Sequence, residues 1–502
     1  MRKNLLLGLL MACYSILAAR PGDVLFATNV VHELRLNFSD PFYWDSLISS
    51  HVTENNVIGQ VTFDGTVLDS CGIKTKGNSS FSGSAQKKSF KIDLNDYISG
   101  QDIDGLNKLN LNNGFKDPTF MREKLALDFL NAHGIAAPRC TYTNLFINGE
   151  LWGVYFLVEE VDGDFCKTRF GNKAGNLFKG DPHGTLQYRG SSLASYYPEY
   201  ELHNNELIND WTDLVQLIGT INSTGYLHIN DTLVKYLNDD LFIQQSIITN
   251  LFVNLDSYTG SGHNYFMYDN DSTKRFEWIA WDVNEVFGTF RLGLSDAQLK
   301  NLSIYYISDP YTSRPLLNMI FQNAYYKSLY NQRYCELFAD FTHTYFDAKI
   351  DSLKELIKVA VYADPKKIYS NTMFDQNIER DYSSGGGPGG GTYFGLKSFI
   401  TERRNAVQHE MDSLGICFKN DISYVTQKSS FIIYPNPSQD YLNIQSSVPI
   451  SKIKIFDALG QLLNETLVTS SLQIQLSTEQ LTAGIYYIEV NQQAKQKFVI
   501  FR

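Results

Sequence analysis

The sequence predicts an α+β protein in which a large mixed domain is followed by a small all-β sandwich. The chain has 502 residues, which is longer than a single hydrophobic core usually supports. Its hydrophobic fraction of 43% supplies ample material for two cores and excludes a disordered chain. After Cys417 the pattern changes from mixed helices and strands to short alternating apolar runs separated by turn residues. We therefore expect two folding units, joined by a linker near residues 418–430.

Residues 1–19 are typical of a cleavable secretion signal. A charged start at Arg2 is followed by an apolar run over 5–11 and by small residues that end at Ala19. The apolar run is too short to span a bilayer, and no run of adequate length follows it, so we expect no transmembrane helix. In an alternative interpretation, Cys13 is the acylated cysteine of a lipoprotein box.

The charge and the cysteines exclude several classes of protein. The formal net charge of -11 leaves no global basic surface, so neither nucleic acid nor anionic lipid is expected as a partner. The cysteines beyond the signal are Cys71, Cys140, Cys166, Cys335 and Cys417. They contain no CxxC pair, so a zinc site is not indicated. Because their number is odd, at least one stays unpaired. Export is compatible with one or two disulfides, but the sequence does not identify the partners.

The C-terminal region, 431–502, consists of short apolar runs with hardly a helical stretch between them. The runs are 431–434, 441–444, 453–456, 472–475, 485–490 and 497–501. Six or seven strands of this length predict a small β-sandwich.

Four motifs in this region follow one another in order: Tyr434-Pro435-Asn436-Pro437-Ser438, then 455–461, 481–487 and 497–500. Together they resemble the C-terminal sorting domain of type IX secretion in the Bacteroidetes, and the match runs to the last residue. The resemblance implies passage across the outer membrane by the type IX secretion machinery, often with removal of this domain and attachment to the cell surface. The alternative is an adhesive or spacer sandwich of the immunoglobulin kind.

The central region, 30–416, begins with strand-like runs on both sides of a Gly/Ser-rich stretch over 72–83. Such a stretch lets backbone N–H groups approach phosphates, and its lysines, Lys74 and Lys76, add positive charge. A surface hairpin rich in Gly, Asn and Ser is the alternative interpretation. A second strand is expected over 89–94.

An amphipathic helix is predicted over 117–130, with Asp117 as its cap. Met121, Leu125 and Phe129 recur at the spacing of one helical face.

A β-hairpin over 142–158 is predicted next, because Asn148-Gly149 is a strong turn signal between two apolar runs. Glu159 and Glu160 follow directly. The order of strand, glycine-rich loop, lysine-bearing strand, helix, hairpin and acidic crossover resembles the N-terminal lobe of a protein kinase.

Two acidic residues stand out in the mostly helical half that follows. Asp256 comes after an apolar helix, and Asp282 ends an apolar strand that we expect to pair with 264–268. One Asp to orient an attacking hydroxyl, and an Asn with a second Asp to hold a divalent ion on ATP phosphates, are the parts that phosphoryl transfer needs. A lone Asp at a strand end is more often a cap or turn residue, but the paired arrangement favours chemistry.

The motifs of this region resemble the spore-coat protein H (CotH) kinase-like family over about residues 30–416. They occur in the expected order at 72–80, 87–92, 121–126, 148–155 with Glu159-Glu160, 176–180, 256–265 and 281–282, and a late helix at 399–404 also fits. The resemblance implies an atypical protein-kinase-like two-lobed domain. It also implies transfer of phosphate from ATP, with Mg or Mn, to Ser or Thr of secreted or surface proteins.

The same resemblance assigns roles to individual residues. Asp256 is implied as the catalytic acid that orients the acceptor hydroxyl, and Asn264 and Asp282 as metal ligands. The implied nucleotide contacts are Lys76, Lys88, Lys91, Glu123, Tyr155 and Glu159. Lys88 or Lys91 would contact the α- and β-phosphates, paired with an acid such as Glu123. The two lysines lie on opposite faces of a strand, and the sequence does not decide between them.

Two features depart from the family pattern or interrupt it. The family usually shows a second acid two residues after the first, where this chain has Asn284, which keeps an oxygen ligand but loses the charge. The tripeptides HRD and DFG of protein kinases are also absent from the sequence. The glycine-rich stretch over 383–391 is predicted to be a loop within the central domain, because a helical pattern resumes over 392–416.

Three functional hypotheses follow from the sequence. The first is an exported Ser/Thr protein kinase. The second is a non-catalytic surface adhesion or invasin-like binding protein on a kinase-like scaffold, because ATP is scarce outside cells. The third treats the acids as a glycosidase pair, although Asp256 and Asp282 lack a distinctive glycosidase context. The sequence does not identify the acceptor protein.

Overall fold

The chain folds into two compact units, Met1–Cys417 and Phe418–Arg502, which are described separately. The computed structural model describes residues 20–27, 29–81, 86–223, 225, 229–384, 391–417, 431–458, 460–491 and 495–502. The predicted signal at 1–19, with Cys13, and the predicted linker at 418–430 lie outside the described residues.

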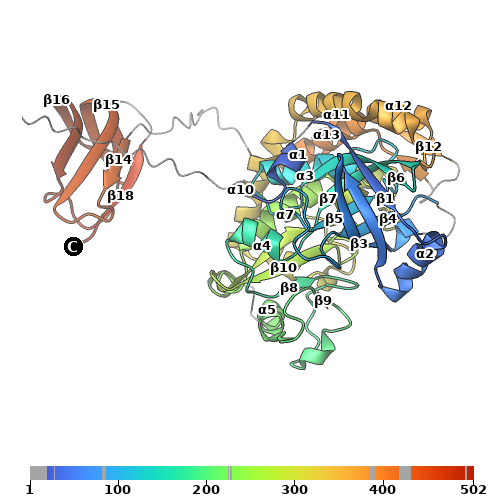
Figure 1. Cartoon of the computed structure of the whole chain (residues 1–502). Helices are drawn as coiled ribbons and strands as arrows, with labels where there is room; N and C mark the ends of the chain where they lie inside the picture. The colour runs from blue at the N-terminus through green and yellow to red at the C-terminus, as the bar shows by residue number, and fades with distance from the viewer. Residues whose placement is uncertain are drawn as a thin grey trace, which may run out of the picture. The chain divides into compact units, whose positions relative to one another are not determined.

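A closed β-barrel forms the N-terminal part of the first unit (Figure 1). Its strands are β1 (Val31–Asn37), β2 (Val57–Phe63), β3 (Thr66–Lys76), β4 (Ser89–Asp93), β5 (Lys108–Asn112), β6 (Cys140–Ile147) and β7 (Glu150–Glu159). The order around the barrel is β1-β2-β3-β4-β5-β7-β6, and the parallel pairing of β1 with β6 closes it. The predicted hairpin of β6 and β7 is confirmed, with Asn148 and Gly149 both at positive φ in its turn.

Alternation along the strands separates the barrel core from its outer face. Ile73 of β3 and Phe90 and Ile92 of β4 are fully buried in the core that fills the barrel. Because side chains alternate along a strand, Lys91 lies on the opposite face of β4 from these apolar neighbours. The barrel thereby presents Lys91 on its outer face.

The helix α3 (Arg122–Ala132) begins later than the sequence predicted. The Asp117 carboxylate accepts hydrogen bonds from the backbone N–H of Thr119 and Arg122 and from the Arg122 guanidinium, so Asp117 stabilises a turn ahead of the helix. Phe120 has a φ of 52°, which interrupts any helix over 117–121. The predicted apolar face is confirmed, since Leu125 and Phe129 are fully buried.

The rest of the first unit combines a small sheet with helices. The sheet has the order β11-β10-β8-β9. Its strands are β8 (Leu177–Lys179), β9 (Glu201–Leu202), β10 (Tyr265–Asn270) and β11 (Arg275–Ala280). The predicted pairing of the strand before Asp282 with residues 264–268 is present as β10 against β11, with Tyr265 as the first paired residue.

The first unit has further helices besides α3. They are α1 (Asp23–Ala27), α2 (Tyr43–Thr53), α4 (Gly163–Phe170), α5 (Thr212–Ser223), α6 (Asn230–Leu233), α7 (Asp239–Leu251), α8 (Asp296–Lys300), α9 (Pro315–Gln322), α10 (Ala324–Asp340), α11 (His343–Ala363), α12 (Asn371–Glu379) and α13 (Leu396–Leu414). In Figure 1, α11, α12 and α13 lie together along one side of the unit, and α11 packs on β7, α3 and α13. The strands β12 (Tyr382–Ser384) and β13 (Gly391–Tyr393) pair antiparallel, and residues 385–390 of the predicted glycine-rich loop lie outside the described residues.

An aromatic cluster joins α3 to the helical part. The Phe129 ring lies 5.6 Å from the ring of Phe252, 6.0 Å from that of Phe341 and 5.6 Å from that of Phe346, measured between centroids. Such pairs add to the apolar burial that orders the helices around α3. The aromatic contacts of Phe129 therefore fix α3 against the helical part of the unit.

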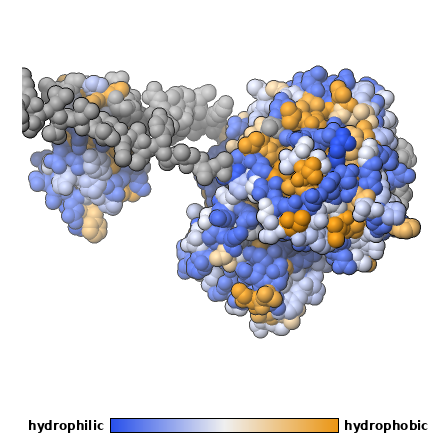
Figure 2. Space-filling model, viewed as in Figure 1, coloured by the Kyte–Doolittle hydropathy of each residue, from blue (hydrophilic) through white to orange (hydrophobic). Residues whose placement is uncertain are grey.

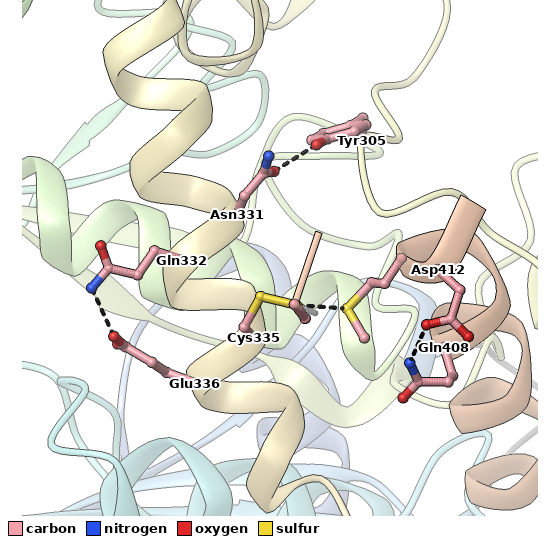
Figure 3. Close-up of a disulfide and its surroundings, with 9 residues drawn as sticks. Tyr305, Asn331, Gln332, Cys335, Glu336, Gln408 and Asp412 are labelled. Carbon is pink, nitrogen blue, oxygen red and sulfur yellow. Dashed lines mark hydrogen bonds between the residues drawn. A yellow bond between two sulfur atoms is a disulfide. The ribbon is translucent and has the colours of Figure 1, made fainter. Parts of the chain in front are cut away.

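One disulfide is present among the described residues, between Cys335 of α10 and Cys417 just after α13 (Figure 3). The described cysteines Cys71, Cys140 and Cys166 are buried and free. The expectation that at least one cysteine stays unpaired is thus confirmed, and the structure supplies the pairing that the sequence left open.

The second unit is all-β. Its strands are β14 (Phe431–Tyr434), β15 (Tyr441–Phe456), β16 (Leu462–Ser477), β17 (Gly484–Val490) and β18 (Gln496–Ile500). The described strands number five rather than six or seven, because the runs at 441–444 and 453–456 belong to one long strand. β15 pairs with β14, β16 and β17, and one face buries a cluster that includes Leu442, Ile453 and Ile488.

The visible surface of the first unit is largely hydrophilic, with separate apolar patches rather than one continuous field (Figure 2). None of the helices in the described part of the chain combines the length and the apolar character that crossing a bilayer requires.

Candidate functional site

A small pocket lies where the barrel, α3 and the end of β11 meet. Its lining residues are Lys76, Asn112, Glu123, Leu127, Pro138, Val158, Trp281 and Asp282. Its volume of about 10 Å³ accommodates a water-sized group, so a nucleotide requires the side chains around it to move apart. Three residues singled out from the sequence, Lys76, Glu123 and Asp282, therefore share one pocket.

Lys76, the last residue of β3, carries the positive charge of this pocket. Its Nζ donates to Asn110 Oδ1 at 3.0 Å and lies 5.4 Å from the centre of the Trp281 ring. Burial lowers the pKa of Lys76, and the carboxylates of Asp282, Glu160 and Glu123 oppose the shift. The ammonium thus lies among three acids without a direct ion pair to any of them in the described structure.

Glu123 in the first turn of α3 is incompletely satisfied. Its Oε1 accepts from Asn112 Nδ2 at 2.8 Å, whereas its buried Oε2 has no hydrogen-bond partner among the described residues. Burial raises the pKa of Glu123 to about 7. A buried carboxylate oxygen without a donor is costly, and this one belongs to a residue that lines the pocket.

Lys91 and Lys88 point to different partners. Lys91 Nζ lies 2.8 Å from Glu160 Oε1, and Asn110 Nδ2 donates to Glu160 Oε2 at 2.6 Å. Although burial opposes the effect, Lys91 and Asn110 lower the pKa of Glu160 to about 2. Lys88 Nζ instead donates to the Phe81 carbonyl at 3.1 Å and covers the Phe81 ring. Lys91 thus belongs to the polar network around Asn110, and Lys88 to the glycine-rich loop.

Tyr155 and Glu159 do not line this pocket. Tyr155 is fully buried in the barrel core, where its ring lies 4.7 Å from Lys87 Nζ. Glu159 is buried between Arg139 and Arg169, with ion-pair distances of 2.6 and 2.9 Å.

Asp256 lies in the loop after α7 and is held by two side chains from the segment before β10. His263 Nε2 lies 2.7 Å from Asp256 Oδ1, and Asn264 Nδ2 donates to the Asp256 carbonyl at 3.0 Å. Burial opposes the shift, but the hydrogen bond with Asp256 raises the pKa of His263. Because the amide nitrogen of Asn264 is used in this way, its oxygen is left for a ligand.

Asp282 follows β11 in a left-handed backbone conformation, with a φ of 50°. Burial of the carboxylate raises the pKa of Asp282, Lys76 opposes the shift and Asp256 adds to it. Asp282 is only partly buried, so contact with water reduces this rise in its pKa. Asp256 and Asp282 are therefore close enough to interact electrostatically. Among the described residues, no group of three or more His, Cys, Asp or Glu side chains is arranged to hold a metal ion.

Four charged residues near the site were not singled out from the sequence. Lys179 at the end of β8 lies 2.6 Å from Asp181, and both interact electrostatically with residues of the site. Lys116 Nζ contacts both carboxylate oxygens of Glu285, at 2.9 and 2.7 Å. Lys179 falls within the motif at 176–180, which was a usable signal. Nothing local in the sequence marks Lys116.

Some of the motif residues stabilise the fold rather than line the pocket. Lys87 and Asp364 form a fully buried ion pair, and Lys87 also donates to the Val154 carbonyl at 2.7 Å. A Cβ on Gly153 would overlap the Asp364 side chain, so only glycine fits there. Arg122 is equally buried and donates to Asn377 Oδ1 at 2.8 Å, which ties α3 to α12.

Comparisons with known proteins identify the families that the two units resemble. A family model described as CotH kinase protein matches residues 73–404, and one described as secretion system C-terminal sorting domain matches 432–501. The sorting domain indicates that the protein is secreted or displayed at the cell surface by the type IX route.

Three curated relatives are similar at low identity. Inner spore coat protein H of Bacillus subtilis is 25% identical over 298 residues, which cover 58% of this chain and 78% of the relative. Invasin CotH3 of Rhizopus delemar is 25% identical over 74% of this chain and 66% of the relative. Invasin CotH2 of the same organism is 24% identical over 63% of this chain and 56% of the relative. Since the family model spans well over half of the sequence, the chain belongs to the CotH kinase protein family.

Proposed function

We propose that this chain is an exported atypical protein kinase that transfers the ATP γ-phosphate to Ser or Thr hydroxyls of secreted or surface proteins. The observation that carries the proposal is the shared pocket of Lys76, Glu123 and Asp282, which come from the barrel, α3 and the end of β11. In this proposal the barrel with α3 is the nucleotide-binding lobe and the helical part is the second lobe. The domain limits are 1–19 for the signal, 30–416 for the kinase and 431–502 for the sorting domain.

Lys76 and Lys91 are the proposed contacts to the ATP phosphates. Lys76 is supported by its position beside Glu123, whose unpaired Oε2 is a ready partner once the pocket rearranges. A lysine paired with a glutamate from the neighbouring helix is the arrangement that positions phosphates in kinases. Lys91 is supported by its place in the same polar network through Glu160 and Asn110. Lys88, Tyr155 and Glu159 have other contacts in this structure and gain no support from it.

Asp282 and the side-chain oxygen of Asn264 are the proposed ligands for Mg or Mn. Magnesium is usually held by one or two carboxylates together with substrate phosphates, and these donors fit that pattern. When bound, such an ion neutralises charge on the phosphates during transfer. Asn284 lies two residues after Asp282 and supplies no charge, so we expect metal affinity to depend mainly on Asp282.

Asp256 is the proposed residue that orients the acceptor hydroxyl and accepts its proton. Its side chain is 15% exposed, which leaves access for an acceptor, and its main chain is fixed by Asn264. A carboxylate held in this way places the attacking oxygen and requires no covalent intermediate on the protein.

Labelled-phosphate transfer is the direct test. The mature chain is incubated with labelled ATP, Mg²⁺ or Mn²⁺, and dephosphorylated casein as a generic acceptor. Asp256→Asn and Asp282→Ala are compared with Glu355→Gln, an exposed acid on α11. We expect labelling by the parent and by Glu355→Gln, and its loss in both site variants. Absence of labelling, together with no rise in melting temperature on addition of ATP, contradicts the proposal.

A non-catalytic adhesion protein is the second candidate, and it is favoured by the two Rhizopus relatives, both of which are named invasins. On this hypothesis the family scaffold presents a binding surface and the acids have no chemical role. Binding of the purified chain to host cells or matrix, unchanged in Asp256→Asn, supports adhesion over transfer.

A further inference from the structure

We propose that His263 is a positioning residue that fixes the carboxylate of Asp256 for the acceptor hydroxyl, an inference that rests on the proposed kinase function. The pair is close, with His263 Nε2 at 2.7 Å from Asp256 Oδ1. Within the described residues, no other side chain bonds the Asp256 carboxylate. Among the described side chains, the imidazole of His263 is therefore the group that fixes the orientation of the Asp256 carboxylate.

The direction of the hydrogen bond follows from the chemistry of the two groups. An ionised carboxylate only accepts, so Nε2 of His263 carries the proton and donates it. Oδ1 of Asp256 is thereby occupied, and Oδ2 is the oxygen left for an incoming hydroxyl. Without a donor the terminal torsion of an aspartate is broad, and either oxygen can face the acceptor. The imidazole removes that freedom.

The loop that presents His263 is held by contacts that do not involve its ring. The backbone N–H of Ser261 donates to the Leu255 carbonyl and that of Gly262 to the Ser257 carbonyl, each at 2.9 Å. The Arg314 guanidinium donates to the Gly260 carbonyl from the other side. Gly262 has a φ of 87°, a conformation that glycine adopts readily and that turns the chain before His263. Removal of the imidazole should therefore leave the loop in place.

The electrostatic surroundings explain why Asp256 needs a donor. The carboxylates of Asp256, Asp181 and Asp282 all act on His263, and Lys179 balances Asp181 through an ion pair of 2.6 Å. Asp256 would otherwise face Asp282 with no bonded donor of its own. A hydrogen bond from His263 holds the carboxylate in a single orientation despite that repulsion.

The test compares two replacements of His263 in the full mature chain. His263→Ala removes the donor, whereas His263→Gln places an amide N–H near the position of Nε2. The matched control is His203→Ala, because His203 Nε2 lies 3.0 Å from Glu201 and its side chain is 29% exposed, against 27% for His263. The readouts are kcat and KM for ATP with dephosphorylated casein as acceptor, and the melting-temperature rise on addition of ATP with Mg²⁺.

We expect His263→Ala to lower kcat about tenfold to a hundredfold, with KM for ATP and the ATP-dependent melting shift unchanged. His263→Gln should recover most of the loss, and His203→Ala should match the parent. Equal kcat in His263→Ala and the parent overturns the inference. So does a failure of His263→Gln to recover activity, because the ring itself would then be required, and so does a loss of the ATP-dependent shift. A parent that transfers no phosphate removes the proposed function and the positioning role together, whereas an active parent matched by His263→Ala removes only the latter.

Discussion

Charged side chains that are buried in this protein fall into two groups. Lys87 with Asp364, and Arg122 with Asp117, are fully enclosed and hydrogen-bonded, so they hold the fold together. Glu123 differs from these pairs, because its buried Oε2 has no hydrogen-bond partner among the described residues. Native structures seldom leave buried charges in that state without a functional reason. A partnerless buried oxygen thus supports Glu123 as part of the candidate site, although Arg122 Nε is also buried without a partner among the described residues.

Replacement of Lys76 tests the nucleotide contact. We expect Lys76→Met to weaken ATP binding about tenfold or more, because the replacement removes a charge that would face the phosphates. Isothermal titration with ATP and Mg²⁺ measures the change. Lys167→Met, at an exposed position of α4, is the control for loss of one positive charge. Unchanged affinity in Lys76→Met would contradict the assignment.

The Glu160 ion pair predicts a pH dependence of stability. The pKa of Glu160 is about 2 in the folded chain and near 4.5 when unfolded, so the unfolded state takes up the proton first. Its contribution, at most on the order of 3 kcal/mol, is present above pH 4.5 and is lost as pH falls toward 2. We expect the stability gap between the parent and Glu160→Gln to be largest at pH 7 and to narrow below pH 4.5. Urea unfolding at several pH values measures the gap, and a gap independent of pH would be inconsistent with the pairing.

At the scale of elements, β7 and the end of α11 are locked together through Gly153. Asp364 accepts hydrogen bonds from Lys87 and from the backbone N–H of Val154. Its carboxylate occupies the space that a Cβ on residue 153 would need. The Trp-Gly-Val-Tyr part of the hairpin is therefore explained by packing of α11 on the barrel.

Two glycine replacements in one hairpin separate backbone strain from steric conflict. Gly149 has a φ of 83°, and no atom lies within 4 Å of the point that an added Cβ would occupy. Gly149→Ala should therefore lower the free energy of unfolding by about 1 kcal/mol, through backbone strain alone. Gly153→Ala adds a clash with Asp364 to the strain of its own positive φ, and we expect a loss of about 3 kcal/mol or more. Urea unfolding of both variants checks the order. Equal losses would show that Asp364 can move away without cost.

For the first unit as a whole, the disulfide closes a loop of 82 residues between α10 and the end of α13. Cys417 Sγ lies 3.3 Å from Met411 Sδ, and polar pairs such as Tyr305 with Asn331 and Gln408 with Asp412 lie nearby (Figure 3). The bond therefore ties the last helix of the unit to its interior just before residue 418.

Loss of this bond should destabilise the unit. The loop-closure entropy for a loop of this length corresponds to a stabilisation of about 4 kcal/mol. This value is the upper limit for the loss in free energy of unfolding in the double variant Cys335→Ser with Cys417→Ser. We expect a lower melting temperature in the double variant and no further change on addition of reductant. The parent should fall to the same level in reductant. A parent that is insensitive to reductant and equal to the variant would contradict a stabilising role.

The sequence by itself determined the elements whose signals are local. Asn148-Gly149 specified the hairpin of β6 and β7, and the spacing of Met121, Leu125 and Phe129 specified the apolar face of α3. The change of pattern after Cys417 separated an all-β unit from the mixed one, and ordered motifs identified the family. Turn geometry and hydrophobic periodicity depend on near neighbours, so no tertiary information is needed for them.

Only the tertiary structure decided how distant side chains pair. Asp117 bonds Arg122 and delays the start of α3, Lys88 turns to Phe81 while Lys91 meets Glu160, and Cys335 joins Cys417. The same holds for the pairing of β1 with β6, which closes the barrel, and for the contact of His263 with Asp256. Residue spacing in the sequence predicts neither contact. The partner of a charged or reactive side chain depends on the three-dimensional path of the chain. A buried polar group needs a hydrogen-bond partner, and the fold determines which residues lie within reach.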